Sequence, residues 1–203
     1  MFRQKDRPVS GETVAIMKTN FGTMKIRLFP EIVGVAAENF IELAKQGKYE
    51  NAPFHRIISG FMIQGGDFTR RNGTGGHAAK GPGSTIGDKY DIRLSHIRGA
   101  VAWAKTAMPH SIGSQFYIVH PEEGTHFLDH PEDGGPSDGY TVFGQLYEGF
   151  DVLDAIAGVK SAPSGHAIGF LPLHHTYENS LCFVQLMYTG GCYCFCEGLR
   201  YIT

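Results

Sequence analysis

The stretch FHRIISGFMIQGGDF, residues 54–68, decides how the fold of this chain is interpreted. It sets one arginine, Arg56, and one glutamine, Gln64, among large apolar side chains, with glycines between them. A charge on a strand that otherwise reads as buried is costly unless the charge is paired or hydrogen-bonded. Arg56 is therefore either a structural ion-pair partner or a donor that faces a ligand, and residue type alone favours the ion pair.

The composition narrows the class of protein. With 203 residues, the chain is long enough for one domain with a sizeable core, or for one domain plus a tail. A formal net charge of −2 gives no case for nucleic acid or an anionic membrane as a partner. Residues 1–8 carry charges with no apolar run after them, which predicts no secretory signal and a cytoplasmic location.

The hydrophobic periodicity predicts a β-rich fold. Apolar residues alternate with polar ones over 14–29, which indicates a hairpin, and helical spacing appears near 36–44 and 150–158. Further strands are predicted over 54–58, 62–65, 99–104, 115–119 and 141–146. The long glycine-rich connection over 66–92 is of a kind that is usually functional or disordered. Together these elements predict a mainly antiparallel β barrel or sandwich whose ends are covered by the helices.

A second run, GSQFYIV at residues 113–119, adds to the candidate site. If this run is a strand, Gln115 and Tyr117 share one face. Two glutamine amides, Arg56 and the aromatic and thioether groups of the first run suit an apolar ligand that carries backbone carbonyls. A peptide with a proline ring fits this description, whereas nothing in the set suits acid–base or metal hydrolysis.

The tail offers a second kind of site. His174 and His175, together with the cysteines at 192, 194 and 196, could hold a metal ion. Their spacing is poor, because structural zinc sites usually present Cys-x₂₋₄-Cys pairs. We therefore predict no metal site. His120 and His126 are predicted to be surface histidines, and Trp103 to be core or pocket wall.

The first run resembles the signature of the cyclophilins, a family of peptidyl-prolyl cis-trans isomerases. NGTGG at 72–76, GSQFYI at 113–118 and TVFG at 141–144 match in order downstream, and ENF at 38–40 matches the family's first helix. The resemblance covers about residues 12–160. It implies a closed eight-stranded antiparallel barrel capped by a helix at each end. It also implies rotation about Xaa-Pro bonds without a cofactor or a covalent intermediate.

The resemblance also implies roles for individual residues. Arg56 matches the catalytic arginine, which would donate to the proline nitrogen, with Phe61 and Gln64 beside it. Substrate-binding positions are implied for His55, Met62, Thr74, Ala104, Lys105, Gln115, Tyr117, Phe127, Leu128 and Tyr140.

The chain departs from the family pattern at several of these positions. Tyr117 stands where the family usually has Phe, so a hydroxyl enters an apolar pocket and needs a partner. Phe127 stands where many members have Trp, which resembles the bacterial branch and predicts weak or no cyclosporin binding. Tyr140 stands where others have His, and Trp103 replaces a smaller residue and could crowd the groove. The insertion over 129–139 lengthens a loop near the site.

The chain is predicted to divide into three parts: an N-terminal extension over 1–11, a cyclophilin-like isomerase domain over 12–160 and an atypical tail over 161–203. Within the tail, Ser180–Tyr188 could be the closing strand. The alternative is that residues 161–203 reflect a reading-frame error. If Ser180–Tyr188 does not supply this strand, one edge of the sheet is left unpaired, which favours aggregation.

The leading function is a monomeric prolyl isomerase that assists protein folding by acting on proline-containing peptides and unfolded proteins. The alternative is a proline-peptide-binding or chaperone-like module with little turnover. The presence of both Arg56 and Gln64 favours the enzyme.

Overall fold

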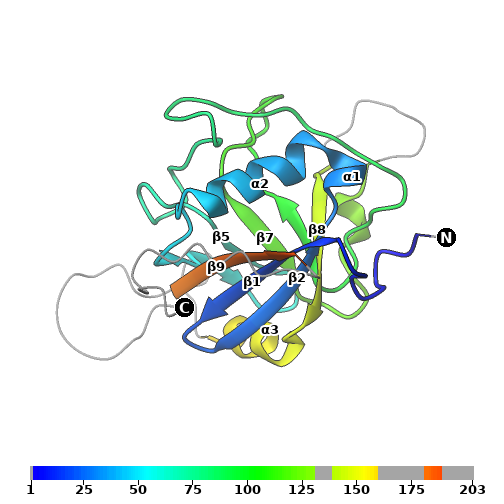
Figure 1. Cartoon of the computed structure of the whole chain (residues 1–203). Coiled ribbons are helices and arrows are strands. Elements are labelled where there is room, and N and C mark those ends of the chain that lie inside the picture. Colours follow the sequence, from blue (N-terminus) through cyan, green and yellow to red (C-terminus); the bar gives the residue numbers. More distant parts are fainter. Residues whose placement is uncertain (1, 131–138, 160–180, 189–203) are drawn as a thin grey trace, which may run out of the picture.

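One antiparallel sheet organises the part of the chain that the structure describes. The computed structural model describes residues 2–130, 139–159 and, as one strand, 181–188 (Figure 1). The strands are β1 (Thr13–Thr19), β2 (Gly22–Leu28), β3 (Ala52–Pro53), β4 (Arg56–Ile58), β5 (Met62–Gly65), β6 (Ala100–Trp103), β7 (Phe116–Val119), β8 (Val142–Glu148) and β9 (Leu181–Tyr188). Their order in the sheet is β3-β9-β1-β2-β8-β6-β7-β5-β4.

The helices lie on either side of this sheet. They are α1 (Pro30–Val33), α2 (Val35–Lys45) and α3 (Phe150–Ala157), with a 3₁₀ turn, η1, at His126–Leu128. Figure 1 shows α2 above the strands and α3 below them. The prediction of a mainly antiparallel β fold with two amphipathic helices is confirmed. None of the helices in the described ranges combines the length and hydropathy needed to cross a membrane.

The strand predicted over 54–58 is confirmed over Arg56–Ile58, but not at its first two residues. The chain instead forms β3 and β4, joined by Phe54 and His55, which are only 2% and 6% exposed. These two residues belong to no strand, so the ladder is interrupted between β3 and β4. Because β3 and β4 are the two end strands of the sheet, this two-residue link brings the sheet's ends together in the chain.

Strand β9 lies between β1 and β3. Its backbone runs antiparallel to β1 along its length, with Val14 opposite Met187, and it pairs with β3 where Ala52 lies opposite Cys182. The edge of β1 that faces away from β2 is therefore paired, as an aggregation-resistant sheet requires.

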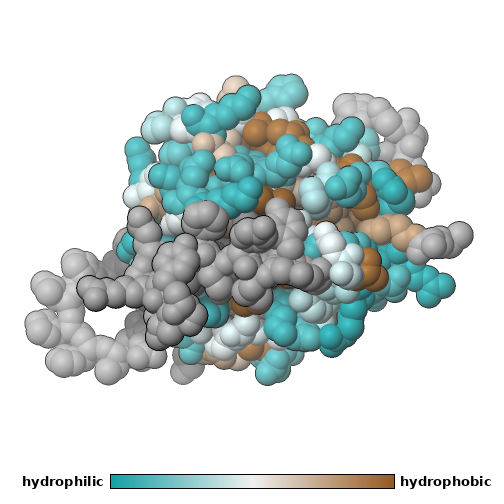
Figure 2. Space-filling model, viewed as in Figure 1, coloured by the Kyte–Doolittle hydropathy of each residue, from teal (hydrophilic) through white to brown (hydrophobic). Residues whose placement is uncertain are grey.

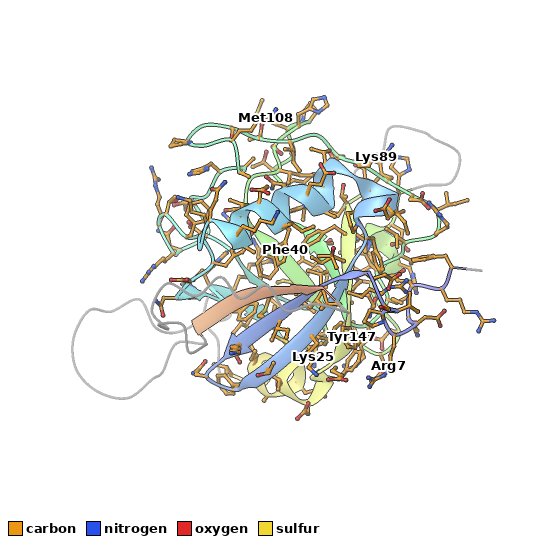
Figure 3. The ribbon with its side chains drawn as sticks, viewed as in Figure 1. Arg7, Lys25, Phe40, Lys89, Met108 and Tyr147 are labelled. Carbon is orange, nitrogen blue, oxygen red and sulfur yellow. The ribbon has the colours of Figure 1, made fainter. Side chains whose placement is uncertain are left out.

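An aromatic cluster fills the space between α2 and the sheet. Phe40 projects from α2 into this space (Figure 3) and contacts the rings of Trp103 and Phe143 at centroid distances of 6.2 and 5.1 Å. Trp103 is fully buried, and its indole N–H donates to the carbonyl of Ala36 at 3.0 Å. The suggestion that Trp103 crowds the groove is wrong, because its strand register places it with Phe116 on the core face.

The N-terminal residues pack against β2. Arg27, which is 7% exposed, pairs with Glu12 at 2.5 Å and donates to the backbone carbonyls of Arg3 and Asp6. Phe2 packs edge-on against Phe29 at 5.5 Å. Arg27 thus follows the usual rule that a buried arginine is paired. On the face shown in Figure 2, the described surface is mostly hydrophilic with small apolar patches.

Candidate active site

The strand register gathers the candidate residues on one face of the sheet. Arg56 on β4 lies opposite Gln64 on β5, and Gln64 lies opposite Tyr117 on β7. Cross-strand partners in an antiparallel pair point to the same side. The three side chains therefore share the face away from the core, while Ile63 and Phe116 point into the core.

A chain of side-chain amides orders the polar half of this face. Arg56 Nη1 donates to Gln64 Oε1 at 3.4 Å, and Gln64 Nε2 donates to Gln115 Oε1 at 3.0 Å. Gln115 Nε2 in turn donates to the carbonyls of Gly73 and Gly75 at 2.9 and 2.8 Å. Because carbonyls only accept, these last two bonds fix which end of each amide is the donor. Gln64 consequently turns its oxygen toward Arg56.

Arg56, which is half-buried, makes no ion pair with any carboxylate in the described ranges, whereas two other arginines with little exposed side-chain surface do. Arg27 pairs with Glu12, and Arg98 pairs with Glu122 and Asp154 at 2.9 and 2.7 Å. The single contact of Arg56 to a neutral amide, at 3.4 Å, is long for a hydrogen bond. Most of the five donors of this guanidinium therefore stay available to a ligand.

Aromatic and apolar groups form the other half of the face. Tyr117 and Met62 are 5% and 2% exposed, and Tyr140 meets the Tyr117 ring edge-on at 5.9 Å. Phe61 stacks on Phe127 at 5.9 Å, and Phe127 is 77% exposed. The backbone N–H of Tyr140 donates to the carbonyl of Leu128 at 3.0 Å. These contacts place η1 beside Phe61, which directly precedes β5, and beside Tyr140, which contacts Tyr117 of β7.

A groove of about 380 Å³ runs beside the amide chain. The predicted residues Gln64, Thr74, Ala104, Lys105 and Gln115 all line it. Thr85, Thr106, Ser111 and Gly113 also line it, and the sequence interpretation missed them. They lie in irregular loops, where no periodicity could have placed them on the groove.

Lys105 is held at the rim by compensating groups. Its Nζ lies 3.1 Å from Asp88 and 3.2 Å from the Tyr90 hydroxyl, and 5.5 Å from the centre of the Tyr140 ring. Burial lowers the pKa of Lys105, but the hydrogen bonds to Tyr90 and Asp88 outweigh it and leave that pKa raised. Lys105 is therefore protonated, and the carboxylate of Asp88 balances its positive charge.

His55 lies behind the groove wall. It is 6% exposed, and a Cβ built on Gly73 would lie 2.9 Å from its Cδ2. Gly73 also has a φ of +89°, a conformation that side chains rarely adopt. The ring of His55 therefore supports the glycine wall, and the lining of the groove does not include it.

Asp67 organises the loop that carries Thr74. Its carboxylate is fully buried and accepts the backbone N–H groups of Arg70, Gly73 and Gly75 at 2.9, 2.9 and 3.0 Å. Burial raises the pKa of Asp67, but these backbone hydrogen bonds outweigh it and hold the pKa below its usual 3.8. One ionised side chain thus shapes the glycine-rich wall of the groove.

The hydroxyl of Tyr117 finds its partner in the interior. Its Oη lies 2.9 Å from Nε2 of His96, and His96 Nδ1 lies 2.6 Å from Asp129 Oδ1. Burial raises the pKa of Asp129, but the hydrogen bonds from His96 and Ser95 outweigh it and keep the pKa well below 3.8. Sequence reasoning identified the need for a partner but had no signal for His96 or Asp129.

Acidification should destabilise the protein through these two carboxylates. Each has a folded-state pKa below its unfolded value, so its contribution is present above about pH 4 and is lost as the pH falls through the folded-state pKa. We expect the free energy of unfolding, from urea titrations, to decrease between about pH 4 and pH 2. The decrease should be shallower in Asp67→Asn. A stability that stays level or rises over that range would contradict this assignment.

The two histidines predicted at the surface, His120 and His126, differ in their exposure. His126 is exposed, whereas His120 is half-buried and accepts the backbone N–H of Gly60 at 2.9 Å. Within the described ranges, no cluster of three or more His, Cys, Asp or Glu could hold a metal. His174, His175 and the cysteines at 192, 194 and 196 lie outside those ranges, as does most of the 129–139 insertion.

The structure defines a β-sheet protein with a groove beside a cluster of aromatic and apolar side chains, and comparisons assign it to a family. Residues 14–168 match the family model "Cyclophilin type peptidyl-prolyl cis-trans isomerase/CLD". The chain therefore belongs to the cyclophilin-type peptidyl-prolyl cis-trans isomerases, and it is an enzyme of that class.

Relatives and solved structures agree with this assignment. A Staphylococcus aureus (strain USA300) protein named "Putative peptidyl-prolyl cis-trans isomerase" is 36% identical over 189 residues, covering 84% of this chain and 91% of its own. A protein of the same name from Staphylococcus saprophyticus is 34% identical, covering 91% of this chain and 98% of its own. The crystal structure of a Cryptosporidium parvum cyclophilin-type isomerase has a TM-score of 0.71 and 28% identity, covering 89% and 99%. A second structure of it, in the presence of the dipeptide Ala-Pro, has a TM-score of 0.70 and 28% identity, covering 88% and 99%.

Proposed function

We propose that Arg56 is the catalytic residue and that it accelerates Xaa-Pro rotation by binding the twisted amide. The barrier to rotation, about 18–20 kcal/mol, comes from amide resonance. At the twisted transition state this resonance is lost and the proline nitrogen gains a lone pair. A guanidinium that donates to this nitrogen stabilises the twisted state more than either planar state, which is differential binding. The mechanism needs neither a cofactor nor a covalent intermediate.

The absence of an ion pair at Arg56 within the described ranges supports this proposal most directly. Arg56 is half-buried, and its one hydrogen bond to a described residue is the long contact to Gln64, so no carboxylate there offsets its partial loss of hydration. Arginine suits the role because it stays charged and presents a fixed fork of donors. Gln64 would orient this fork and would also bind the substrate backbone.

The apolar half of the face would hold the proline ring. Phe61, Met62, Tyr117 and Leu128 would wall the pocket, and Phe127 and Tyr140 would close its rim. The peptide would continue into the groove along Thr74, Ala104, Lys105 and Gln115, with His55 supporting the wall behind it. The C. parvum relative that was crystallised in the presence of Ala-Pro supports proline-containing peptides, and unfolded proteins that display them, as the substrates of this chain.

Exchange NMR on an Ala-Pro peptide tests this function. The cis and trans forms give separate signals, and uncatalysed exchange takes tens to hundreds of seconds. We expect catalytic amounts of the folded protein to bring exchange into a measurable faster range. Saturable peptide binding without acceleration would instead favour the alternative, a binding or chaperone-like module with little turnover.

Cyclosporin should inhibit this protein weakly. Phe127 presents a ring on the rim but has no indole N–H to donate, where many relatives carry Trp. We expect Phe127→Trp to lower the inhibition constant, measured in the exchange assay, because the indole restores a donor and adds contact area. Inhibition of the unsubstituted protein in the low nanomolar range would contradict this expectation.

We also propose that the sheet closes into the eight-stranded barrel of the family, with a helix at each end. The two-residue link between β3 and β4 supports this closure. The sheet has nine strands, but β3 has only two residues. We therefore count eight strands in the barrel and treat β3 as a short addition. We propose residues 12–160 as the isomerase domain, 1–11 as an N-terminal extension and 161–203 as a tail whose β9 supplies the closing strand, in a monomeric protein.

A further inference from the structure

A hydrogen-bonded relay leads from the pocket wall into the interior. Asp129 Oδ1 accepts both the backbone N–H of His96, at 2.7 Å, and His96 Nδ1, at 2.6 Å. An ionised carboxylate only accepts, so Nδ1 of His96 carries the proton of this bond. The hydroxyl of Tyr117 is hydrogen-bonded to Nε2 of the same ring, at 2.9 Å, and this bond ties the pocket wall to His96.

The same aspartate ties down a second wall of the pocket. Asp129 directly follows η1, which contains Phe127 and Leu128. Its other oxygen, Oδ2, accepts the hydroxyl of Ser95 and lies 3.0 Å from Nδ1 of His126. His96 is fully buried and Tyr117 is 5% exposed, so the bond between them is shielded from competing water. Tyr117 on β7 and the apolar residues of η1 thus share one anchor, the Ser95–His96 segment.

An N-terminal residue supports that anchor from behind. The Gln4 amide makes a two-way contact with the Ser95 backbone, donating to its carbonyl at 2.8 Å and accepting its N–H at 2.9 Å. Gln4 also donates to Gln145 on β8 at 3.0 Å, and it is 7% exposed. The Ser95–His96 segment is therefore held between Gln4 on one side and Asp129 on the other.

We propose that His96 and Asp129, supported by Gln4, are positioning residues that hold the proline pocket in its binding shape. The inference rests on the proposed function, in which Tyr117 and Leu128 bind the proline ring. When the pocket already has its binding shape, less of the binding free energy is lost to ordering its walls. Arg56 lies outside the relay, so loss of the relay should weaken substrate binding more than it slows the bound step.

Two substitutions test the relay from opposite ends. Asp129→Asn replaces one acceptor oxygen by a donor group, and Gln4→Ala removes the support behind Ser95. We expect each to raise the dissociation constant of an Ala-Pro peptide about three- to tenfold, as measured by NMR titration. The maximal exchange rate at saturating peptide should change less than about twofold. Gln46→Ala is the matched control, because Gln46 also donates to a backbone carbonyl, that of Ala79.

A double-mutant cycle tests whether Tyr117 is the link. In a Tyr117→Phe background, Asp129→Asn should raise the dissociation constant by a smaller factor than it does in the unsubstituted protein. An equal factor in both backgrounds would overturn the relay, as would unchanged binding in folded Gln4→Ala and Asp129→Asn. If Asp129→Asn does not fold, Gln4→Ala carries the test. Failure of the unsubstituted protein to accelerate exchange would contradict the proposed function instead, since the relay is measured by binding.

Discussion

Arg56→Ala should lower the maximal rate of Xaa-Pro exchange about 100- to 1,000-fold, the loss typical of removing one preorganised transition-state donor. The structure gives Arg56 no carboxylate partner in the described ranges, and its single contact is to Gln64. Its charge is then available to the proline nitrogen when that atom gains its lone pair. The affinity for the planar ground-state peptide should change much less, because the interaction develops only in the twisted state.

Exchange NMR at saturating peptide measures this loss, and peptide titration measures affinity. Arg70→Ala is a suitable control, because Arg70 is an exposed arginine on the loop next to the groove. We expect that control to keep nearly the full rate. A comparable loss in both variants would point to a general electrostatic effect and would argue against a specific donor at Arg56.

Asp67→Asn should lower the free energy of unfolding by about 3 kcal/mol or more, since hydrogen bonds to a charged group each contribute about 1.5–3 kcal/mol. The buried carboxylate accepts several backbone N–H groups at once. An asparagine would direct its own NH₂ group at some of these donors and leave them unpaired. The loop that forms the glycine wall should therefore loosen, and peptide affinity should fall with it.

Urea unfolding measures the loss of stability, with Asp91→Asn as the matched control. Asp91 pairs with Arg93, whose side chain is 51% exposed, so its removal should cost less than about 1 kcal/mol. Equal losses in the two variants would show that the burial of Asp67 does not organise the loop.

Local periodicity predicted most of the fold. The alternation over 14–29 predicted the β1–β2 hairpin, and the helical spacing of Phe40 and its neighbours predicted α2. The start of the strand predicted over 54–58 could not be placed correctly, because its first two residues link the two end strands of the sheet. The face of Trp103 was also beyond the sequence, since all four residues of β6 are apolar and buried.

The site was predictable where one short run carries its parts. Arg56 and Gln64 lie eight positions apart in one motif and meet across a hairpin. The relay of Tyr117, His96 and Asp129 has no such signal, because its residues come from β7, a loop and the end of η1. The Gln4–Ser95 contact spans 91 positions and depends entirely on how the N-terminal residues pack.

We propose that Arg56 faces the substrate and is not a structural ion-pair partner. The decisive experiment measures the free energy of unfolding and the maximal exchange rate on one preparation of Arg56→Ala. We predict a stability within about 1 kcal/mol of the unsubstituted protein, with the rate reduced at least about 100-fold. A stability loss of about 3–5 kcal/mol, with an unchanged rate per folded molecule, would contradict it, because that is the result of breaking a buried ion pair.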